Sequence, residues 1–128
     1  MKKIITTASA PAPIGPYSQA VLVNNTLYIS GQIALIPGTG NLETINMVKE
    51  TNQVMHNLMN ILKEAGMDFS NVVKTTIFLT DMSDFATVNE VYGSYFSSDF
   101  PARETVQVSA LPRNVHVEIS MIAAKLSA

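Results

Sequence analysis

The chain has 128 residues and a mass of 13.9 kDa, with no repeat or linker, so residues 1–128 are expected to form a single domain. Hydrophobic residues make up 47% of it and the mean hydropathy is +0.21, which excludes intrinsic disorder. Ten acidic side chains against eight scattered basic ones give a net charge of −2, so nucleic acid is not an expected partner. The absence of cysteine excludes disulfides, thiolate catalysis, zinc knuckles and iron–sulfur clusters.

Charged residues make up only 14% of the chain, compared with about 25% in an ordinary soluble domain. This shortage indicates that partner chains cover part of the surface. No apolar run approaches the roughly 18 residues of a membrane span, and the opening residues lack a secretory hydrophobic region. We therefore expect a cytoplasmic protein that does not enter a membrane.

The first third of the chain is predicted to form three short strands. Residues 2–5 are expected to be the first, and residues 20–23 and 27–30 a hairpin across an Asn-Asn turn, where asparagine tolerates positive φ. Residues 8–18 between them are rich in proline and glycine and are expected to be a loop. An irregular segment of this length in a small domain is often functional.

The rest of the chain is predicted to contain two helices and three strands. Apolar residues recur with helical spacing over residues 45–65, and Gly66 follows as a C-terminal cap. A second helix is expected from the capping side chains around Asp84 to about Phe96. Its expected buried residues include Phe85, Val88 and Tyr92. The strands are expected over residues 71–80, 103–109 and 115–123.

The element order β-β-β-α-β-α-β-β predicts an α+β fold. We expect a two-layer sandwich in which a mostly antiparallel sheet of about six strands carries both helices on one face. Such a domain leaves the other face of the sheet bare. Together with the low charge content, this predicts that the bare face closes against other subunits.

The last two predicted strands carry a group of polar residues. Because side chains alternate along a strand, Arg103 and Thr105 share one side of the first of these strands. His116 and Glu118 share one side of the second. The opposite sides are rich in valine and isoleucine and are the expected seat of the helices. The four polar residues are therefore expected together on the helix-free face.

Two interpretations of Arg103 and Glu118 are open. The pair could be a structural cross-strand ion pair at a subunit interface. Alternatively, the planar guanidinium could bind a substrate carboxylate through two parallel hydrogen bonds, with the glutamate orienting a water molecule for attack on a polar carbon. The pairing alone does not decide between these interpretations.

Several sequence blocks follow one another along the chain. They are Pro13-Ile14-Gly15-Pro16-Tyr17-Ser18-Gln19-Ala20, Tyr28-Ile29-Ser30-Gly31-Gln32-Ile33, Asn89-Glu90-Val91-Tyr92 with Tyr95-Phe96, Pro101-Ala102-Arg103, Leu111-Pro112 and Val117-Glu118-Ile119. Each block alone is a weak signal. In this order and spacing, over essentially the whole chain, the set resembles the Rid (YjgF-type) family of reactive imine and enamine deaminases.

This resemblance implies a chorismate-mutase-like α+β fold assembled as a homotrimer with clefts between subunits. It also implies hydrolysis of short 2-imino acids, such as 2-iminobutanoate and 2-iminopropanoate, to 2-oxo acids and ammonia, for which neither a metal nor a cofactor is expected. Arg103 would hold the substrate carboxylate, and Glu118 would bind and orient the attacking water. The cleft would be lined by Tyr17, Ser30, the Gly31 backbone and Thr105.

Three positions depart from the family pattern. Thr105 stands where many members carry cysteine, so cysteine redox chemistry is excluded there while a small polar group remains. Glu104 replaces a frequent serine and is expected to point away from the cleft. Ser120 replaces a frequent glutamate.

Other interpretations stay open beside the deaminase. A non-catalytic regulatory trimer could bind 2-oxo acids through Arg103, although retention of Glu118 favours catalysis. An endoribonuclease is disfavoured because the chain is acidic and its two histidines lie far apart in the sequence.

Several smaller signals have structural alternatives. Tyr17 could plug the sheet edge, and Gly31 could simply permit a bulge or a close backbone approach. Asn89 is expected to be a structural hydrogen-bonding group, His56 a surface or interface residue, and His116 a residue at the rim of the cleft.

Overall fold

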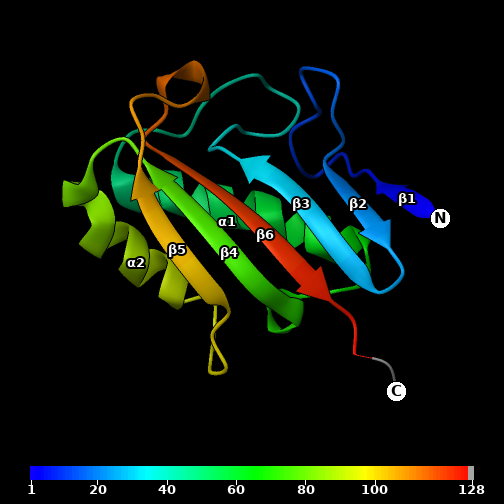
Figure 1. Ribbon diagram of the computed structural model, residues 1–128. Helices are drawn as coiled ribbons and strands as arrows, with labels where there is room; N and C mark the ends of the chain where they lie inside the picture. Colours follow the sequence, from blue (N-terminus) through cyan, green and yellow to red (C-terminus); the bar gives the residue numbers. More distant parts are fainter. Residues whose placement is uncertain (127–128) are drawn as a thin grey trace.

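The computed structural model describes residues 1–126 and contains a six-stranded sheet with two helices packed on one face (Figure 1). The strands are β1 (Lys2–Ile5), β2 (Ala20–Val23), β3 (Thr26–Gln32), β4 (Val72–Leu79), β5 (Ala102–Gln107) and β6 (Val117–Ala124). The helices are α1 (Met47–Glu64) and α2 (Phe85–Gly93), with short 3-10 turns η1 (Phe69–Asn71), η2 (Met82–Asp84) and η3 (Pro112–Asn114). The predicted α+β sandwich is confirmed.

The sheet has the strand order β1-β2-β3-β6-β4-β5, which places the last strand of the chain near its centre. Every neighbouring pair is antiparallel except β4 and β5. Those two are parallel because α2 carries the chain back across the sheet between them. The predicted β2–β3 hairpin is present, and Asn24 has the positive φ that its turn requires, at 55°.

Helix α1 has the caps that its sequence indicates. The Asn46 side chain accepts a hydrogen bond from the backbone N–H of Lys49 at 2.8 Å, which starts the helix slightly later than predicted. Gly66, with φ of 73°, follows the last turn. The apolar stripe between these ends packs against the sheet, and its fully buried members include Val54, Leu58 and Ile61.

Helix α2 is shorter than predicted because the chain leaves the helix axis after Gly93. Phe96 then turns back onto Tyr92, with ring centroids 4.9 Å apart, and onto Phe69 at 5.5 Å. Val88 and Tyr92 are buried as expected. The prediction that Phe85 is buried is wrong, because its side chain is 37% exposed at the start of the helix.

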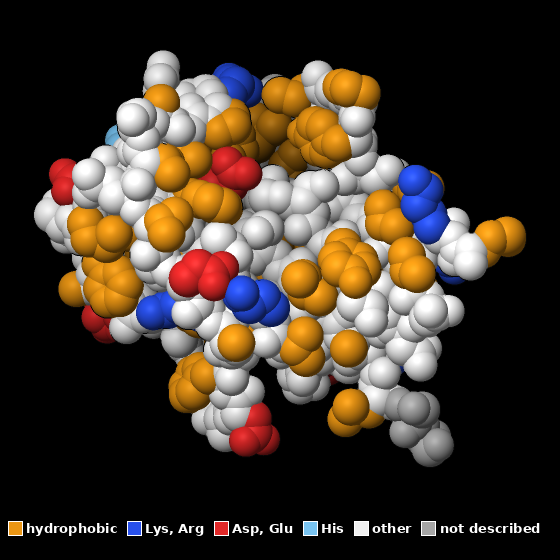
Figure 2. Space-filling model, viewed as in Figure 1, with side chains coloured by type: hydrophobic (Ala, Val, Ile, Leu, Met, Phe, Trp, Pro, Cys, Tyr) orange, Lys and Arg blue, Asp and Glu red, His pale blue; other side chains and the backbone are white. Residues whose placement is uncertain are grey.

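The other face of the sheet is open and is the face seen in Figure 2. Hydrophobic side chains are spread over it, and acidic and basic side chains meet over β4 and β5. Lys74 and Glu104 form that ion pair at 3.0 Å, and Thr76 hydrogen-bonds the same carboxylate at 2.5 Å. Among residues 1–126, no helix has the length and apolarity that crossing a membrane demands.

Candidate functional site

A hollow of about 390 Å³ lies at the end of the open face where the long loops gather, and hydrophobic side chains surround it (Figure 2). Glu118 of β6 is the acidic residue in its lining. The other lining residues are Pro11, Ala12, Ile14, Tyr17, Gln19, Ser30, Gly31, Gln32, Ile33, Leu35 and Pro112. The structure therefore brings together four of the predicted site residues: Tyr17, Ser30, Gly31 and Glu118.

Gly31 allows the Glu118 carboxyl group to lie directly against the backbone of β3. A Cβ atom at position 31 would overlap the Glu118 carboxyl group, so only glycine fits there without displacing it. The β3–β6 register also shifts between Ile29 and Gln32 at this point. Both the bulge and the close approach predicted for Gly31 are thus present, and they are part of the hollow rather than an alternative to it.

The hollow is a mainly apolar environment for an acid. Glu118 is half-buried, and burial raises the pKa of its carboxyl group above the usual glutamate value. Ser30 donates its hydroxyl hydrogen to the carbonyl of Ser18 at 2.6 Å, which ties β3 to the loop that carries Tyr17. The Tyr17 side chain is 50% exposed and lines the mouth of the hollow instead of plugging the sheet edge.

Buried side chains behind the hollow fix two of its walls. Gln19, only 2% exposed, accepts from the Thr7 N–H at 2.7 Å and donates to the carbonyls of Thr7, Ala10 and Pro11 at 3.0, 3.2 and 2.8 Å. Asn57 of α1 donates to the carbonyls of Ile33 and Leu35, both at 3.0 Å. The sequence interpretation missed both roles. The signal for Asn57 is a polar residue on the apolar stripe of a helix.

Arg103 lies elsewhere, under the edge strand β5 on the side of α2. Its Nη1 donates to the Asn89 Oδ1 at 2.7 Å, and its Cζ lies 5.2 Å from the Tyr92 ring centroid and 5.7 Å from that of Phe85. Burial raises the pKa of Tyr92, while its hydrogen bond to Thr75 and the positive charge of Arg103 act in the opposite direction. The hydrogen bond expected of Asn89 is present, and the group that donates it is the guanidinium.

The guanidinium retains unused binding capacity. Within residues 1–126, no carboxylate lies within 4.0 Å of it, so its charge is not paired. Its lone hydrogen bond to a protein atom uses one of five N–H donors. It borders a hollow of about 420 Å³ lined by Asn89, Tyr92, Gly93, Phe100, Pro101 and Arg103.

The prediction that Arg103 and Glu118 share the helix-free face of one chain is wrong. In the β4–β5 register Arg103 lies opposite Thr75, whose hydroxyl accepts a hydrogen bond from Tyr92 of α2, so both face the helices. In the β4–β6 register Glu118 lies opposite Phe78, and both face the open side of the sheet. The two residues are three positions along β4 and two strands apart, which places their Cα atoms about 14 Å from each other on opposite faces. The structure therefore also excludes a cross-strand ion pair between them within the chain.

The same reversal affects the neighbours of Arg103 on β5. Thr105 faces α2, and its hydroxyl is buried without a hydrogen-bond partner among the described residues. Glu104, expected to point away from the cleft, lies on the open face with Glu118, and so does Val106, which is 40% exposed. The expectation that valines on this strand seat the helices is therefore wrong.

The two histidines lie away from both hollows. His56 is exposed on α1, as expected. His116 was expected at the rim of the cleft, but its Nδ1 lies 2.8 Å from the carboxylate of Glu50, a buried residue of α1. This contact joins the imidazole to the helix layer, and a position of His116 at the rim of a cleft between subunits stays a prediction.

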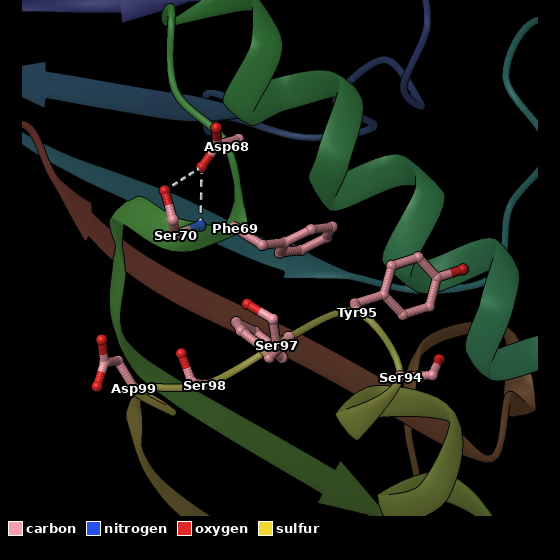
Figure 3. Close-up of a pocket in the computed structure, with 9 residues that line it drawn as sticks. Asp68, Phe69, Ser70, Ser94, Tyr95, Ser97, Ser98 and Asp99 are labelled. Atoms are coloured by element: carbon pink, nitrogen blue, oxygen red, sulfur yellow. Dashed lines mark hydrogen bonds between the residues drawn. The ribbon is translucent and has the colours of Figure 1, made fainter.

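A hollow of about 510 Å³ beside η1 is lined by Asp68, Ser70, Tyr95, Asp99 and neighbouring residues (Figure 3). Its polar groups serve local structure. The Asp68 carboxylate accepts from the backbone N–H of Ser70 at 2.8 Å and from its hydroxyl, and Tyr95 donates to Asn52 at 2.7 Å. Residues 1–126 contain no group of three His, Asp or Glu side chains able to hold a metal ion.

Comparison with known proteins finds relatives that share the sequence and the fold of this chain. The family model described as Endoribonuclease L-PSP matches residues 7–125. The mouse protein named 2-iminobutanoate/2-iminopropanoate deaminase is 56% identical over 123 residues, which cover 96% of this chain and 91% of the mouse protein. A solved structure of a Rid-family protein from Yersinia pestis is 47% identical with a TM-score of 0.95, covering 98% of this chain and 100% of that one. Escherichia coli TdcF, solved with bound serine, is 38% identical with a TM-score of 0.93, covering 97% and 99%.

Proposed function

We propose, from the premise that the chain belongs to the Rid (Endoribonuclease L-PSP) family, that it hydrolyses short 2-imino acids to 2-oxo acids and ammonia. The observation that carries the proposal is the half-buried Glu118 carboxyl group, held against Gly31 in a hollow with Tyr17 and Ser30. Relatives more than half identical to this chain are named for 2-iminobutanoate and 2-iminopropanoate. These are the substrates we propose here.

The reaction requires that a water molecule is positioned against the imine carbon and that protons are transferred. The imine carbon is already electrophilic, so water adds to it once oriented, and a proton passes from the water to the Glu118 carboxylate and then to the nitrogen. The hydroxyl proton of the resulting carbinolamine then passes to the nitrogen, the C–N bond breaks as the carbonyl forms, and ammonia leaves the 2-oxo acid. The raised pKa of Glu118 supports this role, because a higher pKa makes its carboxylate a stronger base toward the proton of the attacking water.

Arg103 is proposed to hold the substrate carboxylate. Its unpaired charge and free donors suit a two-pronged contact with a carboxylate, and the serine bound to Escherichia coli TdcF is a small molecule that carries such a group. Since Arg103 and Glu118 lie on opposite faces of one chain, a substrate can contact both only if two chains contribute.

We therefore place the site in a cleft between subunits of a homotrimer. The open face supports this assembly, because it exposes apolar side chains such as Ile4, Tyr28 and Val106 to solvent in the single chain. A ring of three chains joined head to tail would give three equivalent clefts. The cytoplasmic location stays a prediction.

The test is an assay with imine generated in place. A dehydratase releases 2-iminobutanoate from threonine, and the formation of 2-oxobutanoate is followed with and without the protein. We expect acceleration by the wild type. We expect Arg103→Ala to lower kcat/KM by about 100-fold, since two charge-assisted hydrogen bonds contribute about 3 kcal/mol.

Arg113→Ala is the matched control. Arg113 is the other arginine of the chain and donates to the Gly40 carbonyl at 3.2 Å, so this variant should retain activity. A wild type that binds 2-oxobutanoate in calorimetry but does not accelerate hydrolysis would instead support the non-catalytic trimer. RNA cleavage lost in Glu118→Gln would support the endoribonuclease of the family description.

A further inference from the structure

Glu50 is a carboxylate with no exposed surface, lying in the first turn of α1. Its Oε2 accepts hydrogen bonds from the backbone N–H groups of His116 and Val117 at 2.7 and 3.1 Å. Its Oε1 lies 2.8 Å from the Nδ1 of His116. One side chain of the helix layer thus binds the beginning of β6 at three points.

These contacts lie directly before Glu118 in the sequence. His116 and Val117 immediately precede Glu118, so the two bound N–H groups fix the backbone from which the Glu118 side chain projects. The Thr80 N–H also donates to the His116 carbonyl at 3.2 Å, which ties the same residue to the end of β4. Beyond this point, the Glu118 carboxyl group lies directly against Gly31.

Joining a helix to a strand through a buried carboxylate has a high cost in free energy. Desolvation of the charge is costly, and only several charge-assisted hydrogen bonds offset it. An apolar side chain would fill the space at lower cost, but it would leave two backbone N–H groups without a partner and would not define their position. Glu50 therefore defines the position of the backbone at the start of β6, which an apolar side chain would not do.

We propose that Glu50 is a positioning residue for the proposed hydrolysis: by binding the N–H groups of His116 and Val117, it holds the Glu118 carboxyl group in register with Gly31. This inference rests on the proposed function only in assigning the chemistry to Glu118. The placement of Glu118 by Glu50 can be measured without any reaction.

Variants at position 50 separate the acceptor from the charge. Glu50→Gln retains an oxygen for the two backbone N–H groups and turns its amide toward His116 Nδ1, which accepts in the other neutral tautomer. Glu50→Asp retains the charge but withdraws it from the strand by one methylene. Glu50→Met fills the volume and provides no acceptor of comparable strength.

Kinetics give the first readout. We expect Glu50→Asp to lower kcat by about 10-fold or more with little change in KM, because a shift of about 1 Å at a catalytic group is costly while Arg103 still anchors the carboxylate. Glu50→Met, if it folds, should show the same fall in kcat with little change in KM. Glu50→Gln should remain within about threefold of the wild type, since it keeps the acceptor.

The matched control is Thr51→Val, the adjacent and equally buried position, whose hydroxyl donates to the Met47 carbonyl of its own helix at 2.7 Å and has no other partner within residues 1–126. This variant should lose stability without losing kcat. An equal fall in kcat for Thr51→Val and Glu50→Asp would overturn the proposal, because the effect would then follow stability alone. A wild-type kcat in Glu50→Asp would overturn it as well.

Amide resonances of Gly31 and Glu118 give the second readout, without substrate. We expect them to move in Glu50→Asp and to stay near their wild-type positions in Glu50→Gln and Thr51→Val. Unmoved resonances in Glu50→Asp would contradict the positioning role. If the wild type proves inactive as a deaminase, the proposed function fails, while these resonances still decide whether Glu50 places Glu118.

Discussion

The placement of Glu118 has a thermodynamic consequence at the scale of one residue. Burial disfavours its ionised form and raises its pKa in the folded state, so the folded chain binds more protons than the unfolded chain between the two pKa values. The contribution of Glu118 to the free energy of unfolding must therefore fall as pH rises through this window and level off above it. The carboxyl group to which the proposed function assigns proton transfer is thus a destabilising group at neutral pH.

We expect Glu118→Gln to raise the melting temperature at pH 7, because the amide fills the same space without a charge to desolvate. Below the unfolded pKa both chains are neutral at this position, and the difference should vanish. Thermal unfolding monitored by circular dichroism from pH 3.5 to 8 checks this. A variant less stable than the wild type at pH 7 would show that the ionised carboxylate is stabilised by contacts beyond those described.

The four residues of the Glu118 hollow that the sequence indicated lie on β3, on β6 and in the long loop that precedes β2. Alternation along β6 is clear, since Val117 and Ile119 are buried while Glu118 is not. The glycine at position 31 indicated a close approach, and the structure shows the carboxyl group that makes it. The raised pKa of Glu118 needed the structure, because it depends on loops far apart in the sequence.

At the scale of elements, β5 shows why alternation alone can assign a strand to the wrong face. It is an edge strand, and its residues Ala102–Gln107 are all at least partly exposed, so the sequence has polar groups on both sides. The valine at position 106 indicated a helix-facing side that the register with β4 contradicts. Pairing with β4 in parallel, a tertiary property, decides which side of this strand meets α2.

On helix α1, the contribution of Asn57 to the wall of the Glu118 hollow can be tested. Asn57 is buried on its apolar stripe and holds the carbonyls of Ile33 and Leu35, which line the Glu118 hollow. Replacing it with leucine leaves both carbonyls without this donor. We expect Asn57→Leu to lower the free energy of unfolding by about 1–3 kcal/mol in urea titration.

Asn60, on the same helix, is the control. It donates to the Ser9 carbonyl at 2.9 Å in an exposed environment, so Asn60→Ala should change the free energy of unfolding by less than about 0.5 kcal/mol. Equal losses in the two variants would contradict this role of Asn57, because both replacements favour the helix and only Asn57 holds the two carbonyls of the wall.

At the scale of the whole molecule, the chain divides the proposed chemistry between its two faces. The guanidinium proposed to bind the carboxylate lies beside α2, and the carboxyl group proposed to accept the proton lies on the open face. The low charge content of the sequence indicated a covered surface, and apolar groups exposed on the open face agree with it. What the sequence could not indicate is that Arg103 and Glu118 lie on opposite faces of the sheet.

This division predicts that two inactive variants restore each other. Arg103→Ala and Glu118→Gln are unfolded together in equal amounts and refolded, so that mixed trimers form. Each cleft then receives an intact arginine and an intact glutamate with a probability of one half each, and activity should reach about a quarter of the wild type. Mixing the folded proteins without unfolding is the control and should give no recovery if subunits exchange slowly. If the refolded mixture stays inactive while refolded wild type recovers, both groups must act from one chain, which would require β5 to present Arg103 on the opposite face.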